Sequence, residues 1–536
     1  MQKQVFTPGA SFQSDTIYVA DRAEYHIYPT DATEVIRPWW TFVYSDDKPL
    51  TAAFVLRGLQ NVTIDLSGAK LIFHGRIMPF ALFDCKNVTL RNFSIDYDRP
   101  FFTEGTVLDS HDGEVTIEVP PLYRYRIEGR DLIAVSDTWE HRLTNGDMLF
   151  RCFDPETRLP SRHSGVILAL IGDNLTPRPT PPLPIHQLFA YDAGERKIRI
   201  TGLPESFVPR IGEILAMTHE DRRKHGILLE RSEDTTIENI RFYHIGAMGV
   251  VANLSRNITV RRLDMYIDET CADRVVTVNA DSFHTFHCDG KIVVEDCRFE
   301  NMLDDAINIH GNYLYCLAKT GERELRVESK AQALVQMEYF LPGDAVVIYK
   351  GNTQEVRTRG VVESAEYEGD SDYMRVRFTE KIGEIEDGDM LESERMPEIE
   401  VCRCHSRCMG GFRISSSRRV VIEDCTFETA AFSVAFTGDM NYWFENGPVK
   451  DVTIRRCTFT NCAIPVTTGC GFRPTTAAPF YHENLRFTEN AIHLAGNAIL
   501  DLSDMRGITY ENNTVTGVQD GQMPIRLNRC SDVTIR

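Results

Sequence analysis

The amino-acid sequence predicts an all-β protein, a right-handed parallel β-helix (a solenoid) with two inserted β-rich modules. Three observations lead to this prediction. A short strand motif recurs along the chain, its copies are spaced by about one solenoid coil, and no amphipathic helices lie between them. Coils of this length that stack through backbone hydrogen bonds form a continuous core, with rungs about 4.8 Å apart.

The recurring motif has two or three β-favouring residues, a polar residue, an Asn or Asp, and a large apolar residue three positions later. It occurs at 88–95, 236–242, 293–299, 421–427, 453–459 and 508–515. Asn and Asp tolerate left-handed backbone, so their column predicts a sharp bend in every coil. That column is Asn92, Asn239, Asp296, Asp424 and Asn512, with Arg456 as the exception. The next column holds Cys297, Cys425 and Cys457, which we interpret as small apolar groups stacked inside the coil.

The spacing of the motif supports a solenoid. Equivalent threonines lie 26, 23 and 25 residues apart, at positions 63 and 89, 236 and 259, and 509 and 534. Two longer intervals, 34 residues from 259 to 293 and 32 residues from 421 to 453, indicate coils with loop insertions.

Two long stretches interrupt this rhythm and show strand-like alternation with turn residues. We interpret them as β-rich modules inserted in solenoid loops, where insertions often wall a site. The expected organisation is an N-terminal part of the β-helix at 1–100, a β-rich module at 101–227, coils with the candidate acids at 228–312, a β-barrel-like module at 313–400 and C-terminal coils at 401–536.

Composition narrows the classes of partner. The 536 residues are 42% hydrophobic and 25% charged, with a net charge of −20 and a pI near 5.3. This balance argues against nucleic acid or an anionic membrane as a partner. No apolar run reaches the roughly 18 residues that span a membrane, and the N-terminus lacks the apolar core of a signal peptide. We therefore expect a cytoplasmic protein, unless the natural chain is longer at its N-terminus.

The 14 cysteines form no compact framework of even spacing. Only Cys402, Cys404 and Cys408, with His405, are clustered. They could hold a metal ion such as zinc, but no second group of regularly spaced ligands follows them. Buried free thiols are the expected state. We expect no metal and no organic cofactor.

Two adjacent carboxylates interrupt the repeat in "FENMLDDAINIHG". Asp304 and Asp305 occupy the fifth and sixth positions after Phe299, where sibling coils carry mostly apolar or small residues. A solvated turn is the alternative interpretation, since Asp is common in turns, but such a turn would be polar in every coil. A departure from the chain's own repeat favours a functional site.

A third carboxylate lies one coil earlier, in "NADSFHTFHCDG". Phe283 and Ile307 are 24 residues apart, and the same offset places Asp281 beside Asp305 on adjacent rungs. Asp304 then points elsewhere, because successive strand residues face opposite sides. His284, His287, Asn308 and His310 flank the acids, and about two of these four are expected to be structural. Neighbouring carboxylates repel each other and separate their pKa values, as a general acid and a general base require.

The segments at 71–101, "NADSFHTFHCDG" and "NMLDDAINIHG" resemble glycoside hydrolase family 110, the exo-acting α-1,3-galactosidases. The resemblance covers most of the chain. It implies a β-helix akin to that of the polygalacturonases, an inverting mechanism, and removal of terminal α-1,3-linked galactose, including that of blood group B structures. The matching catalytic positions are Asp281, Asp304 and Asp305, and we assign His284, Asn308 and His310 to substrate binding.

The sequence departs from the polygalacturonases at two points. "NAD" stands where they have Asn-Thr-Asp, and their cationic Arg-Ile-Lys motif is missing, with "RIS" at 413–415 as the nearest approach. With no visible Lys/Arg cluster near the acids, a neutral sugar is favoured over a uronate.

Two alternatives remain open at this stage. One is a pectinase-like β-helix hydrolase of another polysaccharide, and the other is a non-catalytic carbohydrate-binding solenoid. No motif distinguishes linear from branched, fucosylated substrates, and an exposed solenoid flank is compatible with a homodimer. Within the favoured hypothesis, Asp304 is expected to be the general acid, and Asp281 with Asp305 the base pair that activates water.

Overall fold

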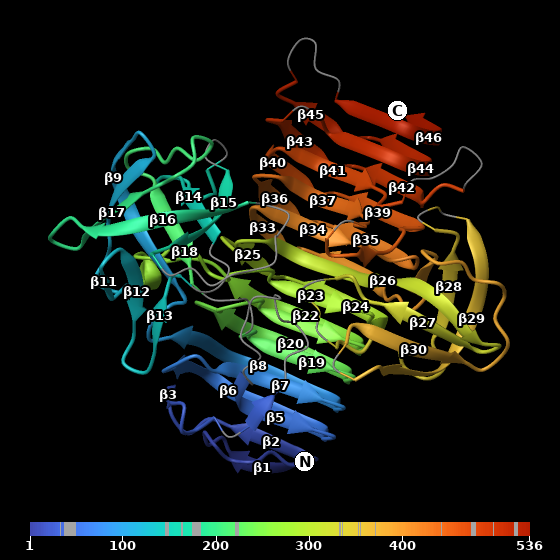
Figure 1. Cartoon of the computed structure of the whole chain (residues 1–536), viewed down its shortest axis with the longest axis horizontal. Helices are drawn as coiled ribbons and strands as arrows, with labels where there is room; N and C mark the ends of the chain where they lie inside the picture. The colour runs from blue at the N-terminus through green and yellow to red at the C-terminus, as the bar shows by residue number, and fades with distance from the viewer. Residues whose placement is uncertain are drawn as a thin grey trace.

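The computed structural model confirms the right-handed parallel β-helix with two β-rich modules (Figure 1). The coils stack from the blue N-terminal end to the red C-terminal end, and the modules lie on either side of the stack. The structure describes residues 1–536 except 33, 37–49, 145–148, 162–164, 174–183, 220–223, 332–333, 335, 352, 354, 370, 441, 473–478, 497 and 519–523.

Each coil contributes to up to three parallel sheets. The first sheet contains β1 (Gln2–Val5), β2 (Thr16–Val19), β6 (Gln60–Phe73), β8 (Lys86–Tyr97), β20 (Glu233–Phe242), β22 (Arg256–Met265), β24 (Asp289–Glu295), β32 (Glu398–Cys402), β35 (Arg419–Glu423), β39 (Asp451–Arg455), β42 (His482–Thr488), β44 (Leu500–Glu511) and β46 (Ile525–Ile535).

The second sheet begins with β3 (Glu24–Ile27) and uses the C-terminal parts of β6, β8, β20 and β22. It continues through β25 (Arg298–Glu300), β33 (His405–Cys408), β36 (Thr426–Thr429), β40 (Thr458–Cys462), β43 (Ala491–Leu494) and β45 (Thr514–Thr516).

The third sheet carries the candidate acids. Its strands are β5 (Leu50–Arg57), β7 (Met78–Phe83), β19 (Ile227–Glu230), β21 (Val250–Asn253), β23 (Phe283–Phe286), β26 (Asp305–Gly321), β34 (Gly410–Ile414), β37 (Phe432–Thr437) and β41 (Ile464–Gly469), followed by the first residues of β44. The short β4 (Glu34–Ile36) pairs antiparallel with β5 at the edge.

The predicted bend column has left-handed backbone throughout. The φ angles of Asn92, Asn239, Asp296, Asp424 and Asn512 lie between 51° and 59°. Arg456, the exception in sequence, has a φ of 52° as well, and its Nε donates to Asp424 Oδ1 of the preceding coil at 2.8 Å. A non-glycine residue costs free energy in this region, so the ion pair helps to hold a residue less suited to it.

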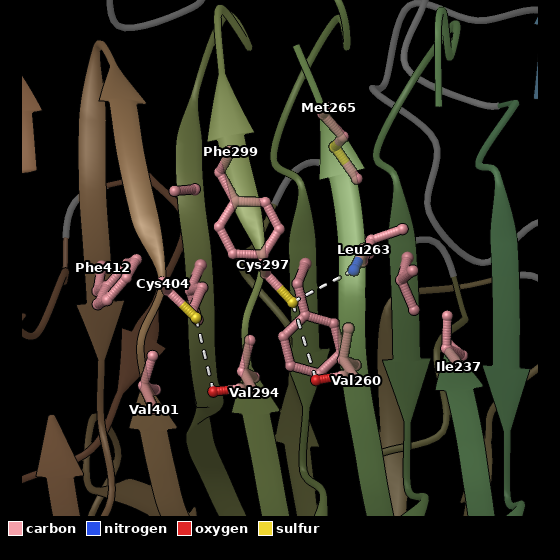
Figure 2. Close-up of a cluster of buried hydrophobic side chains, with 14 of the residues drawn as sticks. Ile237, Val260, Leu263, Met265, Val294, Cys297, Phe299, Val401, Cys404 and Phe412 are labelled. Atoms are coloured by element: carbon pink, nitrogen blue, oxygen red, sulfur yellow. Dashed lines mark hydrogen bonds between the residues drawn. The ribbon is translucent and has the colours of Figure 1, made fainter. Parts of the chain in front are cut away.

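The predicted cysteine ladder of Cys297, Cys425 and Cys457 lies inside the coils, and Cys404 extends it; Figure 2 shows Cys297 and Cys404. Cys297, Cys404, Cys425 and Cys457 are at most 2% exposed and occur in successive coils. The Cys404 thiol donates to the Val294 carbonyl at 3.6 Å. Cys402 is half-buried and Cys404 is buried, and the chain bends between them at Arg403, whose φ is 52°. Among the described residues, the cysteines and His405 of "CRCHSRC" form no group of possible metal ligands.

The first module is a closed barrel inserted between β8 and β19. Its strands run in the order β10 (Glu114–Glu118), β17 (Lys197–Thr201), β16 (Ile185–Asp192), β15 (Val166–Ile171), β14 (Leu149–Phe153), β18 (Ile214–Thr218) and β9 (Phe102–His111). A small sheet of β11 (Tyr125–Glu128), β12 (Asp131–Val135) and β13 (Glu140–Arg142) accompanies the barrel.

The second module grows out of the far end of β26. Antiparallel pairings join β26 to β27 (Glu324–Glu328), β30 (Tyr373–Phe378), β29 (Val356–Tyr367), β28 (Ala345–Tyr349) and β31 (Met390–Ser393), and β31 pairs with β26 again. The pairings therefore close this module on itself.

Helix contributes almost nothing to the described part of the chain. The 3-10 turn η1 (Glu269–Cys271) is the helical element there, and no helix among the described residues is long and apolar enough to cross a membrane.

Candidate active site

The three aspartates predicted from the sequence lie together at the N-terminal ends of β23 and β26, two neighbouring strands of the third sheet. β23 and β26 pair in the register Phe283 to Ile307, which confirms the predicted offset of 24 residues. The Asp305 N–H donates to Asp281 Oδ1 at 3.0 Å across the two coils. One carboxylate oxygen from each of Asp281, Asp304 and Asp305 lies within 4.8 Å of the others.

The barrel fixes the segments that precede these aspartates. The buried Glu104 of β9 accepts hydrogen bonds from the N–H groups of Val275 and Val276, at 2.8 and 2.9 Å. Burial raises the pKa of Glu104 to about 7. Arg151 of β14 donates to the carbonyl of Leu303, the residue before Asp304, at 3.5 Å. The barrel is thus part of the support of the acids.

The Asp305 carboxylate is held by contacts to the next coil. Asp305 is 5% exposed, and its Oδ2 accepts from Arg413 Nε at 2.9 Å. Its Oδ1 lies over Gly410 of the next coil, at 2.1 Å from where a Cβ at that glycine would stand. Burial raises the pKa of Asp305 to about 7, with Arg413 opposing the shift and the neighbouring aspartates adding to it.

Arg413 is a cationic side chain beside the acids. The sequence showed no Lys/Arg cluster there and offered only "RIS" at 413–415, and in the structure Arg413 pairs in register with Asn308 on the adjacent strand and contacts Asp305. Its guanidinium also donates to Thr437 Oγ1 and lies 5.0 Å from the centre of the Phe432 ring. The second module separates Arg413 from Asp305 by 108 residues, so only the coil register connects them.

Two histidines extend the acid cluster along the sheet. His284 Nδ1 is hydrogen-bonded to Asp281 Oδ2, and His284 Nε2 lies 2.8 Å from His310 Nε2. His310 Nδ1 in turn lies 2.6 Å from the Gly311 carbonyl oxygen. Burial, with help from nearby positive charge, holds the pKa of His310 well below its usual value. Both ring nitrogens of each histidine are therefore engaged by protein atoms.

Glu445 is a site residue that the sequence did not reveal. It lies on β38 (Glu445–Asn446), which pairs antiparallel with Gly311 and Asn312 of β26. Its Oε1 is 3.4 Å from His310 Nε2. Burial raises its pKa to about 8, although Arg413 opposes the shift. At neutral pH this carboxyl group is mostly protonated.

The geometry of His284, His310 and Glu445 is that of a hydrogen-bonded cluster. One donor atom from each lies within 4.8 Å of the others. Two imidazoles bound to one tetrahedral zinc ion, at about 2.0–2.1 Å each, would hold their nitrogens about 3.3 Å apart. The observed 2.8 Å is shorter and matches a hydrogen bond between the rings.

The residues assigned to substrate binding divide into two kinds. Asn308 is 4% exposed, and its Oδ1 has no hydrogen-bond partner among the described residues, so it retains an acceptor for a ligand hydroxyl. His284 and His310 have their ring nitrogens committed to the chain described above. His287, left undecided by the sequence, accepts from the Asn312 N–H at 2.9 Å.

Comparison with protein families agrees with the fold. Residues 379–536 match the family model described as "Right handed beta helix region".

Curated relatives are similar over most of the chain. The chain is 29% identical to an alpha-1,3-galactosidase B of Bacteroides thetaiotaomicron over 489 residues, which cover 88% of the chain and 76% of that protein. It is 25% identical to an alpha-1,3-galactosidase A of Shewanella woodyi over 510 residues, 92% of the chain and 79% of that protein.

A solved structure also aligns along the chain. The family 28 exopolygalacturonase of Yersinia enterocolitica is 10% identical with a TM-score of 0.32, and the match covers 97% of this chain and 70% of that one.

Proposed function

We propose that this protein is a glycoside hydrolase that removes terminal α-1,3-linked galactose by an inverting general acid–base mechanism. The observation that carries the proposal is the convergence of Asp281, Asp304 and Asp305 from neighbouring coils, with oxygens within 4.8 Å. Burying several carboxyl groups together costs free energy that a purely structural turn would avoid. The relatives named alpha-1,3-galactosidase support galactose as the sugar and the α-1,3 linkage as the bond.

In this proposal Asp281 and Asp305 hold the attacking water between them. Oxygens no more than 4.8 Å apart can both accept a hydrogen bond of about 2.8 Å from one water molecule. The spacing is shorter than the roughly 6.5–9.5 Å that usually separates acid from base in inverting enzymes. The Asp304 carboxyl group must therefore turn away from Asp281 and Asp305 when the sugar ring binds between the acid and the water.

Asp304 is the proposed general acid. It is the least buried of the three aspartates, whereas Asp281 and Asp305 are 3% and 5% exposed. Asp304 lies just before β26, and its greater exposure lets its carboxyl group reach the glycosidic oxygen of a bound substrate. Asn308, with its unpaired Oδ1, is the proposed contact to a hydroxyl of the galactose.

A pectinase-like hydrolase is the second candidate, because Arg413 places a guanidinium beside the acids. We favour the neutral sugar, since that guanidinium already donates to Asp305 and to Thr437. A uronate carboxylate would have to compete with Asp305 for it.

One substrate panel separates these candidates from a non-catalytic carbohydrate-binding solenoid. Purified protein is incubated with p-nitrophenyl α-galactoside, α-1,3-digalactoside, α-1,4- and α-1,6-digalactosides and polygalacturonate. Galactose released from the α-1,3-linked disaccharide, and lost in Asp305→Asn, supports the proposal. Reducing ends formed from polygalacturonate alone favour the pectinase. Binding of the digalactoside in calorimetry without any hydrolysis identifies the solenoid as a binding protein.

A further inference from the structure

Hydrogen bonds link Asp281, His284, His310 and the Gly311 carbonyl in a row. The donor and acceptor in each of them can be assigned by starting from the carbonyl. A backbone carbonyl oxygen can only accept a hydrogen bond, so His310 Nδ1, 2.6 Å from the Gly311 carbonyl, must donate. Burial, together with nearby positive charge, holds the pKa of His310 well below its usual value, so this imidazole is neutral. A neutral imidazole with its proton on Nδ1 has a lone pair on Nε2. The nitrogen 2.8 Å away, His284 Nε2, therefore carries a hydrogen and donates it to His310.

The same reasoning then fixes the other side of His284. Its Nδ1 contacts Asp281 Oδ2, while Asp281 Oδ1 accepts the Asp305 N–H. A hydrogen bond between His284 Nδ1 and Asp281 requires one more proton. With Nε2 already protonated, that proton makes His284 an imidazolium, or else it resides on Asp281.

The charges around His284 favour the imidazolium. The groups that face it are Asp281, Asp304 and Asp305 at the coil edge, His310 on β26, Arg413 on β34 and Glu445 on β38. Asp281 contacts His284 directly, so a positive charge on His284 is stabilised by the carboxylate beside it. Glu445, which is mostly protonated at neutral pH, adds little to this stabilisation. Glu445 Oε1 is 3.4 Å from His310 Nε2, whereas His284 Nε2 is 2.8 Å from it. His284, the nearer group, is therefore the hydrogen-bond donor to His310 Nε2.

We propose that His284 is held as an imidazolium whose charge neutralises Asp281, so that Asp305 alone takes the proton from the attacking water. His284 and His310 are then positioning residues and not sugar ligands. The assignment of the proton to Asp305 rests on the proposed function, whereas the protonation state of His284 does not.

The protonation state can be measured without any substrate. Protein labelled with ¹³C at histidine Cε1 is followed by NMR between pH 5 and 9, and the signals are assigned with His284→Gln and His310→Gln. We expect His284 to stay at the imidazolium position and His310 at the neutral position throughout. A neutral His284 signal at pH 7 overturns the proposal. So does a displacement of both signals by EDTA, because it would mean that a metal ion stands in place of the proton.

The consequence for catalysis is tested with pH profiles of kcat/KM. In His284→Gln the ionised Asp281 faces Asp305 without compensation, so the acidic limb of the profile should move up by about one pH unit. His310→Gln keeps a carbonyl that accepts from His284 and should leave the limb in place, whereas His310→Leu should shift it. An equal loss of kcat/KM at every pH in all three variants would contradict the proposed role of His284 and His310. If no variant and no wild-type protein hydrolyses a galactoside, the proposed function fails, and the NMR result stands separately.

Discussion

Gly410 gives the sharpest test of how the fold positions Asp305. A Cβ at residue 410 would stand 2.1 Å from Asp305 Oδ1 and 3.2 Å from the Phe432 ring. Ordinary contact begins at about 3.5 Å, so in Gly410→Ala the carboxylate must retreat by more than about 1 Å. A displacement of that size at a reacting group typically costs about 10²-fold in rate, or about 2.7 kcal/mol in the barrier.

The fold should survive this substitution. Both close atoms belong to side chains, and the glycine does not have left-handed backbone. We expect the free energy of unfolding to fall by about 1–3 kcal/mol, the usual cost of overpacking a buried site. Gly321→Ala is the matched control, because its Cβ would meet only Glu324 Cβ at 3.6 Å.

The assay is kcat/KM for galactose release from α-1,3-digalactoside, with thermal unfolding measured alongside. If Gly410 acts through Asp305, the double variant Gly410→Ala/Asp305→Asn should be no slower than Asp305→Asn alone. A folded Gly410→Ala within threefold of wild-type activity would refute the reasoning. So would losses that simply multiply in the double variant.

Three further predictions concern the acids, the buried glutamate and the absence of a metal requirement. The Asp304→Asn variant should hydrolyse the disaccharide about 10²–10⁴-fold more slowly than wild type but lose far less activity on a dinitrophenyl galactoside. Asp281→Asn and Asp305→Asn should lose similar amounts of activity on both substrates. If the good leaving group rescues Asp281→Asn alone, Asp281 is the acid. The pKa of Glu445 is raised from 4.5 to about 8 in the folded state, so its contribution to stability is present at low pH and is lost as pH rises through 8. Thermal unfolding at pH 6–9 should therefore show wild-type stability falling by up to about 3 kcal/mol more than that of Glu445→Gln, and parallel curves would contradict the burial argument. Incubation with EDTA should leave galactose release unchanged, and activity that disappears and returns with zinc would show that a metal ion acts in the site.

Local chemistry made most of the solenoid predictable. The left-handed positions carry Asn or Asp in five of the six aligned coils, because those residues tolerate that backbone. The cysteines beside them are buried inside the coils, as small apolar groups are. The pairing of Asp281 with Asp305 followed from a spacing of 24 residues with no insertion between them.

The sequence alone could not place Arg413 and Glu445 beside the aspartates. The second module lies between Asp305 and Arg413 in the sequence. Their separation of 108 residues therefore does not match the length of a coil and does not show that they lie on adjacent strands. Arg413 lies beside Asn308 in the register of the coils, and Gly410 leaves room for Asp305 Oδ1 on that next coil. Glu445 arrives from a loop after β37 by an antiparallel pairing that follows no repeat.

The central claim is tested most directly by ¹H NMR of wild-type protein acting on α-1,3-digalactoside, followed from the first minutes of reaction. Hydrolysis by a water held between Asp281 and Asp305 predicts that β-galactose appears first and mutarotates later to the equilibrium mixture, and that Asp305→Asn releases neither anomer at a comparable rate. α-Galactose as the first product would contradict the water-activating base pair, and no galactose at all would contradict the proposed activity.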